Sequence, residues 1–345
     1  MTVPVVWALA RQYPDLRITV LSRPSSRPFF EGLAPNVNFM GADIKGEYHG
    51  LKGLNALYRR LVAKQFTAIA DLHNVLRSEY LRIRFNMGHY RVEHINKHRG
   101  DRRRLANHKP SQPLKPLPTS FENYMDVFRR LGYPISLENL CFRSIFETAD
   151  SPSDVHPTGD ISQLPKEIGT KQTKDIWIGI APFAAHKGKI YPVEKMQKVI
   201  EQLIVRCPNC RLFLFGRGPQ EEQTFEQWTA QMPQCTFVGK VVENMHQELI
   251  LMSHLDVMVS MDSANMHMAS LTDTPVVSVW GATHPVAGFM GWHQNSANAV
   301  QVDLDCRPCS IYGNKPCRRD DYACLYQILP ETIVEKITQV LTKKT

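Results

Sequence analysis

The sequence predicts an α/β protein made of two doubly wound domains, each a parallel sheet with helices on both faces. Residues 255–285 read as strand, tight turn, short helix and second strand, which is a βαβ unit. The same rhythm of short apolar runs and helical segments continues on both sides of residues 148–174, which are rich in Ser, Pro, Thr, Asp and Gly. The expected division is an N-terminal domain at residues 1–150, a linker at 151–174, a C-terminal domain at 175–330 and a closing helix at 331–345.

Composition is that of a globular protein, with 345 residues, 43% hydrophobic and 21% charged. Apolar runs all fall short of the roughly 18 residues that a membrane helix needs. The first ten residues are apolar but have no leading positive charge, so they predict a core-facing helix with Pro4 in its first turn and not a signal peptide.

The N-terminal domain is predicted to begin with that helix and not with a strand. A doubly wound domain should start with a strand, so its first strand is expected to be missing from the chain as given. Either the given start is too late, which is the interpretation we favour because the helix looks fitted to a sheet, or the chain has lost the strand. The elements that follow are predicted as strands at 17–22, 37–40 and 66–71, helices at 52–64, 75–84 and 120–131, and a loop at 109–119.

Polar residues follow the strand at 66–71. Asp71, His73 and Asn74 stand at its carboxyl end, where ligands bind in open α/β sheets. The alternative is an ordinary turn in which Asp and Asn bond their own backbone.

Charge is unevenly spread along the chain. Residues 1–150 hold 23 Lys and Arg against 13 Asp and Glu, whereas residues 151–345 hold 18 against 20. Residues 82–109 are the densest basic stretch, which is either a solvated face or a contact for a phosphorylated acceptor or an anionic membrane surface. Nucleic acid is not expected as a partner, because no RNP, helix-turn-helix or zinc-finger pattern accompanies the charge.

The C-terminal domain continues the βαβ rhythm. Strands are predicted at 175–181, 211–215, 235–238, 255–260 and 276–280, and helices at 193–205, 245–253, 265–270 and 331–341. Gly216 and Gly218 form a short glycine turn after a strand, a weak signal for a nucleotide contact.

The unit at 255–285 places a helix N-terminus at the carboxyl edge of the sheet. Asp262 and Ser263 stand where the helix N-cap belongs. Free backbone N–H groups and the helix dipole at such an end suit an anion such as a diphosphate.

These residues also resemble the signature of glycosyltransferase family 9, which contains the ADP-heptose:lipopolysaccharide heptosyltransferases. The matching runs are Asp-Ser-Ala-Asn-Met-His-Met-Ala from Asp262, Thr274-Pro275, and Gly-Ala-Thr-His-Pro from Gly281. Upstream, Ile-Gly-Ile-Ala-Pro from Ile178 with Lys189, Tyr191 and Pro192 is similar to a second family motif. Ala264, Ala282, His284 and Phe183 depart from the family pattern, and the departure at Ala264 leaves the exact sugar open.

The resemblance implies a GT-B architecture, in which two Rossmann-like domains face a cleft, and an inverting transfer with no required cofactor. It places the donor on the C-terminal domain, at Lys189, Asp262, Ser263, Ala264 and His267. Gly216 and Gly218, by their position after a strand, stand where the nucleotide base or ribose would lie. The resemblance places the acceptor on the N-terminal domain, where Asp71, His73 and Asn74 are the candidates by their position at the end of a strand. The family's proposed catalytic base, an Asp, would fall upstream of Met1, so the catalytic residue itself is unassigned, and a chain that has lost the first strand has lost the base with it.

Alternatives remain for several of these residues. Lys189 could be a surface lysine, with Lys187 as its competitor for the diphosphate. Asp262 could be only a helix cap, and His267 could be structural.

Cys306, Cys309, Cys317 and Cys324 form a C-x2-C-x7-C-x6-C cluster. It is compatible with a structural zinc ion, with reduced thiols in a cytosolic loop, or with a disulfide.

The sequence therefore predicts a cytoplasmic glycosyltransferase, peripheral at the inner face of the cytoplasmic membrane. It would move a sugar, by preference a heptose from ADP-heptose, to a lipopolysaccharide core or a related anionic glycan. The alternative is a catalytically inactive nucleotide-sugar-binding protein that lacks the base. The sugar, nucleotide, acceptor and oligomeric state are not determined by the sequence.

Overall fold

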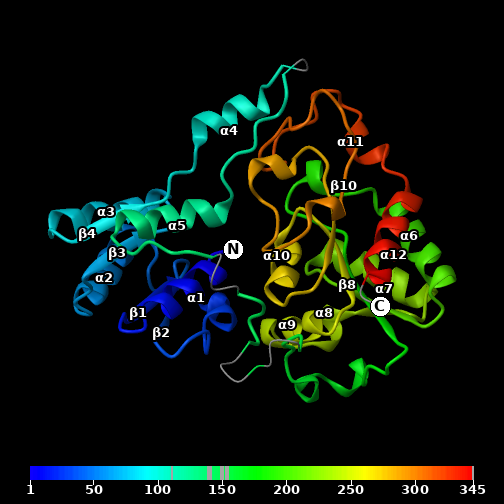
Figure 1. Ribbon diagram of the computed structural model, residues 1–345, viewed down its shortest axis with the longest axis horizontal. Coiled ribbons are helices and arrows are strands. Elements are labelled where there is room, and N and C mark those ends of the chain that lie inside the picture. The colour runs from blue at the N-terminus through cyan, green and yellow to red at the C-terminus, as the bar shows by residue number, and fades with distance from the viewer. Residues whose placement is uncertain (110–111, 138–141, 148–150, 152–154, 344–345) are drawn as a thin grey trace. The chain divides into compact units, whose positions relative to one another are not determined.

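The chain forms two compact units in the computed structural model (Figure 1). Unit 1 comprises residues 1–98 and 118–145, and unit 2 comprises residues 99–117 and 146–345. The structure describes all residues except 110–111, 138–141, 148–150, 152–154 and 344–345. Parts of the predicted loop at 109–119, of the predicted linker and of the closing segment therefore lie outside the described residues.

Unit 2 is built on a six-stranded parallel sheet in the order β10-β9-β8-β5-β6-β7. Its central strands β5 and β8 are neighbours, with Ile178 opposite Val257 and Ala181 opposite Ser260. From β5 the chain continues to β6 and β7 on one side of the sheet, and from β8 it continues to β9 and β10 on the other side. This is the strand order of a doubly wound sheet. The strands are β5 (Ile176–Ala181), β6 (Cys210–Leu214), β7 (Cys235–Phe237), β8 (Val257–Met261), β9 (Val276–Val279) and β10 (Ala299–Val300).

Helices cover both faces of this sheet. On one side α6 and α12 pack together and place Val199, Leu203 and Ile337 in the main core with the inward side chains of the strands. Every residue of β8 is buried, as expected for a strand covered on both faces. The helices of unit 2 are α4 (Arg99–Ala106), α6 (Val193–Arg206), α7 (Pro219–Gln231), α8 (Val238–Val241), α9 (Met245–Ser253), α10 (Ala264–Leu271), α11 (Ala323–Tyr326) and α12 (Pro330–Thr342).

Unit 1 contains two separate parallel strand pairs. β1 (Ile18–Ser22) pairs with β2 (Val37–Gly41), and β3 (Ala68–Asp71) pairs with β4 (Arg91–His94). The first element is a helix, as expected, and the sequence did not predict β4. The strands are less buried than those of unit 2, and Leu21 in β1 is 36% exposed. The helices are α1 (Val3–Gln12), α2 (Gly50–Val62), α3 (Leu76–Met87) and α5 (Ser120–Arg130).

Both strand pairs of unit 1 share an apolar layer. Met40 from β2 lies in the same cluster as Leu57 and Leu61 of α2 and Phe85 of α3, and Ile69 of β3 packs against it. Val127 and Leu131, within and just after α5, form a second cluster with Ile95, against which Ala68 and Ala70 of β3 pack. The unit therefore has the layered packing of an α/β domain, although its strands do not join into one sheet among the described residues.

Residues 99–117 belong to unit 2, although the sequence places them in the N-terminal domain. Leu105 and Ala106 of α4 form an apolar cluster with Ala287 and Ile311. The backbone N–H of Leu117 donates to the carbonyl of Val286 at 2.8 Å. The sequence pattern could not predict this packing, because the segments in contact are far apart in the chain and are assigned by the sequence to different domains.

Two glycine-to-alanine changes should have opposite effects on stability. Gly53 lies in α2, and a Cβ there would sit 2.3 Å from the carbonyl carbon of Tyr48. We expect Gly53→Ala to destabilise the protein by about 1–3 kcal/mol through overpacking. Gly100→Ala in α4 meets nothing within 4 Å and should be neutral or stabilise by up to about 1 kcal/mol. Thermal and urea unfolding check both, and equal effects of the two changes would contradict the packing argument.

Candidate functional site

The candidate site lies where the strand order of unit 2 reverses, at the carboxyl ends of β5 and β8. Ligands bind at such a reversal in open α/β sheets because the loops diverge there. Asp262 and Ser263 follow β8 directly, and Lys189 lies in the loop that follows β5. We call Lys189, Asp262, Ser263, His267 and Thr283 the switch-point site.

Lys189 and Asp262 form an ion pair in this site. The Lys189 Nζ lies 2.8 Å from Asp262 Oδ2, and the two side chains are 15% and 4% exposed. Among the described residues Oδ2 has no hydrogen-bond partner, so this contact is electrostatic and not a well-directed hydrogen bond. Lys187, the competing lysine, is exposed and lies over the ring of Tyr322 at 4.9 Å. The structure thus separates the two lysines and places only Lys189 against Asp262.

The N-terminus of α10 is available to a ligand. Ser263 is its N-cap residue, but the Ser263 side chain makes no capping hydrogen bond and lies 3.1 Å from Ser260 Oγ instead. Asp262 does not cap the helix either, since it faces Lys189. Ala264 begins the helix and is exposed. The first N–H groups of α10 therefore keep their capacity to bind an anion.

Two further buried polar atoms of the switch-point site have no partner among the described residues. They are His267 Nδ1 in α10 and Thr283 Oγ1 after β9. Burial lowers the pKa of His267 to about 3, and the Lys189 ammonium acts in the same direction. Unpaired buried polar atoms are costly unless a ligand or water satisfies them. Thr283 was quoted in the sequence motif but was not predicted to be a site residue.

The glycine turn at Gly216 and Gly218 is arranged differently from a phosphate-binding loop. The N–H of Arg217 donates to Glu221 Oε2 at 2.9 Å, and that of Gly218 donates to Glu222 Oε1 at 3.2 Å. Arg217 is itself paired with the buried Glu248. Because carboxylates already occupy these N–H groups, the turn offers them to no phosphate in this state. A contact of Gly216 or Gly218 with the nucleotide stays a prediction.

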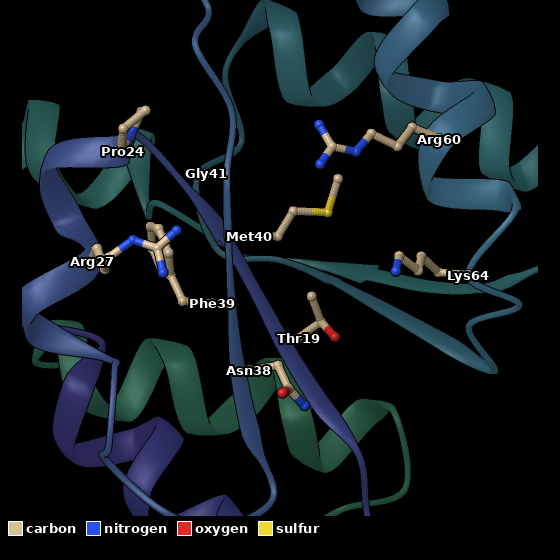
Figure 2. A pocket seen from close by; sticks show the side chains of 9 residues that line it. All are labelled: Thr19, Pro24, Arg27, Asn38, Phe39, Met40, Gly41, Arg60 and Lys64. Atoms are coloured by element: carbon tan, nitrogen blue, oxygen red, sulfur yellow. The ribbon is translucent and has the colours of Figure 1, made fainter.

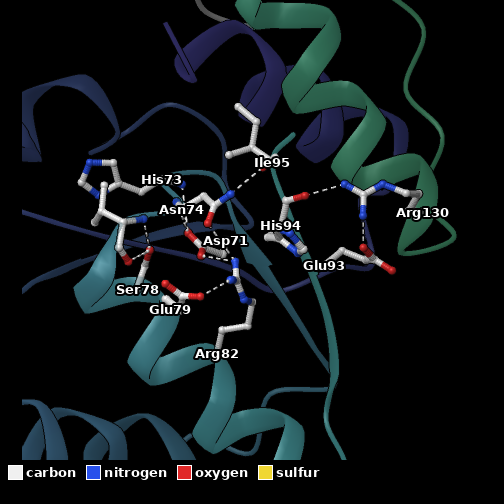
Figure 3. Close-up of polar contacts among 11 residues, drawn as sticks. Asp71, His73, Asn74, Ser78, Glu79, Arg82, Glu93, His94, Ile95 and Arg130 are labelled. Atoms are coloured by element: carbon white, nitrogen blue, oxygen red, sulfur yellow. Dashed lines mark hydrogen bonds and ion pairs between the residues drawn. The ribbon is translucent and has the colours of Figure 1, made fainter. Parts of the chain in front are cut away.

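In unit 1, Asp71 is held by its own turn (Figure 3). Its Oδ1 accepts hydrogen bonds from the N–H groups of His73 at 3.0 Å and Asn74 at 2.8 Å. Its Oδ2 forms an ion pair with Arg82 at 3.2 Å, and Asn74 donates to the carbonyl of Ile95 at 3.0 Å. These contacts are those of the ordinary turn given above as the alternative, and the predicted acceptor role of the three residues stays a prediction.

Unit 1 also has a basic pocket that sequence reasoning missed (Figure 2). Figure 2 shows Arg27 on one side of β2 and Arg60 with Lys64 on the other. The pocket has a volume of about 580 Å³. Arg27 contacts Glu31 at 2.9 Å, and Arg60 donates to the Tyr48 hydroxyl. The residues that line it are Thr19, Pro24, Arg27, Asn38, Phe39, Met40, Gly41, Arg60 and Lys64.

The four clustered cysteines are free thiols. Burial raises the pKa of Cys309 and raises that of Cys324 to about 11, so both favour the protonated, unreactive form. Among the described residues no group of three or more His, Cys, Asp or Glu side chains is placed to hold a metal ion. The structure therefore gives no support to the predicted zinc site, which stays a prediction.

In the part of the chain that the structure describes, no helix is both long and apolar enough to cross a bilayer. A doubly wound sheet, a lysine–aspartate pair at its reversal point and an uncapped helix N-terminus are features that suit a phosphorylated ligand.

The sequence profile of glycosyltransferase family 9 (heptosyltransferase) matches residues 54–318, and the chain belongs to this family. It is therefore a glycosyltransferase of the heptosyltransferase family. No curated protein sequence matches it.

Solved structures resemble the chain over nearly its whole length. The family 9 glycosyltransferase of Veillonella parvula DSM 2008 aligns with a TM-score of 0.70 at 18% identity, over 99% of this chain and 93% of that one. E. coli ADP-heptose LPS heptosyltransferase II gives 0.62 at 18%, over 98% and 93%. E. coli heptosyltransferase WaaC with ADP gives 0.63 at 14%, over 98% and 95%. The fold of the chain is GT-B, with Rossmann-like domains.

His267, a half-buried residue whose Nδ1 atom is fully buried, predicts a pH dependence of stability. The unfolded His267 side chain binds a proton near pH 6.5, but the folded one does so only near pH 3. Between these values the unfolded state holds the extra proton, so stability falls as the pH falls below about 6.5. His284, whose pKa burial and then Arg307 lower to about 4, adds to the same slope.

We expect His267→Asn to flatten the decline of stability between pH 6.5 and 4.5, measured by urea unfolding at several pH values. The exposed His246→Asn is the matched control and should keep the wild-type slope. Parallel curves for wild type and His267→Asn would show that His267 is not buried in its neutral form.

Proposed function

We propose that the protein transfers a heptose from ADP-heptose to an anionic lipopolysaccharide-type acceptor. The ion pair of Lys189 with Asp262 beside the uncapped N-terminus of α10 is the observation that carries the proposal. A diphosphate needs a cation and N–H donors, and a sugar needs acceptors for its hydroxyl hydrogens. The switch-point site has both kinds of group at the place where such ligands bind.

In the free protein the two charges of the site neutralise each other. A diphosphate that enters takes over Lys189, and the carboxylate of Asp262 is then free to accept hydrogen bonds from the sugar hydroxyls. This exchange avoids leaving either buried charge without a partner, which would be strongly destabilising. His267 and Thr283 supply further polar atoms that the ligand would satisfy.

The proposed reaction is an inverting displacement at the anomeric carbon. An acceptor hydroxyl oxygen forms a bond to that carbon while the bond from the carbon to the diphosphate oxygen breaks. The bonding electrons leave with ADP, and the hydroxyl proton passes to a base that remains unassigned. Lys189 and the N–H groups of α10 stabilise the negative charge that grows on the leaving diphosphate.

ADP is the nucleotide we propose, since the similar structure of E. coli heptosyltransferase WaaC was determined with ADP. The acceptor is proposed to bind unit 1, where Arg27, Arg60 and Lys64 line the basic pocket. Phosphates or carboxylates on a glycan would complement these side chains.

A non-catalytic nucleotide-sugar-binding protein is the second candidate function. The same contacts would hold the donor in it, so binding alone does not separate the two. Formation of free ADP together with a heptosylated acceptor would establish the enzyme, whereas binding without turnover would favour the second candidate.

Substitutions of Lys189 and Asp262 should distinguish binding of the donor's diphosphate from binding of its sugar. We expect Lys189→Ala to weaken, without removing, the thermal stabilisation by both ADP and ADP-heptose, because the diphosphate loses its cation but keeps the N–H groups of α10. We expect Asp262→Ala to keep the response to ADP and to lose the additional response to ADP-heptose. Both should hold with a chelator present, since the proposal assigns the diphosphate charge to protein groups.

Lys187→Ala is the matched control, two residues away and exposed, and should respond like wild type. A wild-type response to GDP- or UDP-sugars instead would keep the transferase and discard ADP-heptose. Absence of any nucleotide response in wild type would contradict the proposed donor site.

Attachment to an anionic membrane surface is proposed to use α4. Arg99, Arg103 and Arg104 are exposed on this helix, while Leu105 and Ala106 anchor it to unit 2. We expect the triple change of these arginines to Glu to reduce binding to phosphatidylglycerol-containing vesicles at low salt, by about 1 kcal/mol per charge lost near the surface. Cosedimentation measures the loss.

The control for this experiment changes Lys174, Lys198 and Arg206 to Glu, which removes as many exposed positive charges elsewhere on unit 2. An equal loss in both triple variants would show a net-charge effect and contradict a role for α4.

A further inference from the structure

Arg307 is a buried arginine whose hydrogen-bond partners are all neutral. It is 3% exposed, and it lies in the loop that carries the clustered cysteines. No carboxylate among the described residues forms an ion pair with it. Its guanidinium donates to the carbonyls of Gly281 at 2.6 Å, Trp280 at 3.1 Å, Thr283 at 2.9 Å and Val302, and to Gln301 Oε1 at 2.9 Å.

Three of these carbonyls belong to one short segment, residues 280–283, which we call the 280–283 loop. The loop follows β9 and ends in Thr283, a member of the switch-point site. The planar guanidinium offers donors in fixed directions, so it fixes the direction of several carbonyls at once. Arg307 therefore constrains the backbone of the 280–283 loop at three carbonyls, which a residue that makes one hydrogen bond could not do.

The 280–283 loop is in turn tied to the residue before Lys189. The N–H of Ala282 donates to the carbonyl of Gly188 at 2.8 Å. A Cβ on Gly281 would lie 2.6 Å from that carbonyl oxygen, and a Cβ on Gly188 would lie 3.0 Å from the Cβ of Ala282. The backbones are thus in direct contact, and a shift of the loop must move the turn that carries Lys189.

We propose that Arg307 is a positioning residue for the donor diphosphate. It holds the 280–283 loop, the loop holds Gly188, and the Gly188 turn presents Lys189 to the ligand. Arg307 acts through the geometry of its hydrogen bonds and not through its charge. The inference rests on the proposed function, because it assigns the positioned lysine to a nucleotide diphosphate.

Arg307→Gln, Arg307→Lys and Gly281→Ala test this inference. Arg307→Gln and Arg307→Lys both lose the planar guanidinium with its several N–H donors, but only Arg307→Lys keeps the positive charge. Gly281→Ala keeps Arg307 and pushes the loop away from Gly188 by its added methyl group. We expect all three to bind ADP at least about tenfold more weakly than wild type by calorimetry, the scale of loss that a misplaced binding group causes.

A double-mutant cycle separates positioning from a general loss of structure. In the Lys189→Ala background, Arg307→Gln should add little to the loss of ADP binding, because the lysine it positions is gone. Arg318→Gln is the control, since Arg318 lies in the same loop but bonds the end of α4, and it should bind ADP like wild type. Additive losses, or wild-type affinity in Arg307→Lys or Gly281→Ala, would overturn the inference.

A readout without nucleotide keeps this test apart from that of the proposed function. In wild type Lys189 is paired and 15% exposed, so an amine-acylating reagent should label it slowly, as read by peptide mass spectrometry. Arg307→Gln and Gly281→Ala should label faster at Lys189 and not at exposed lysines. Unchanged labelling would overturn the positioning role, whereas failure of wild type to bind ADP would refute only the proposed donor.

Discussion

The reversal of strand order between β5 and β8 is the constraint on which the site in unit 2 depends. Both strands are buried and parallel, so their carboxyl ends meet at one edge of the sheet. The chain leaves β5 toward Lys189 and leaves β8 toward Asp262. Lys189 and Asp262 are more than 70 positions apart in the sequence, yet Lys189 Nζ lies 2.8 Å from Asp262 Oδ2. They meet because the two paired parallel strands end side by side and the loops that carry them begin there.

The chemistry of the site follows from this meeting of opposite charges. Removing either partner would leave the other charge largely buried without a counter-charge, which is strongly destabilising. In the proposed function, a diphosphate replaces Asp262 as the partner of Lys189, and a sugar replaces Lys189 as the partner of Asp262. Around the ion pair, the uncapped helix and the unpaired atoms of His267 and Thr283 leave capacity that the protein does not use for itself.

The two units differ in how completely their sheets are formed. Unit 2 has a continuous six-stranded sheet, whereas the described strands of unit 1 form two pairs between shared helical layers. Unit 1 also contains the Asp71–Arg82 ion pair and a pocket lined by the basic side chains Arg27, Arg60 and Lys64. Positive charge is thus concentrated on unit 1 and on the helix α4 of unit 2, whereas Lys189 and Asp262 of unit 2 neutralise each other.

The sequence by itself determined the fold class and most elements of unit 2, because buried parallel strands are short apolar runs that periodicity can identify. It also indicated the family, and it predicted Lys189 and Asp262 as donor contacts, since a spaced motif carries both residues. It did not determine that α4 packs on unit 2, that the glycine turn is occupied by Glu221 and Glu222, or that Arg307 anchors the 280–283 loop. Those features arise from side chains that meet only after distant segments have packed, and no local pattern encodes them. Only the tertiary structure distinguishes Lys189, which is paired with Asp262, from Lys187, which lies over the ring of Tyr322. Two lysines that are separated by a single residue are equivalent in a sequence pattern and differ only in what the folded chain places beside each amine.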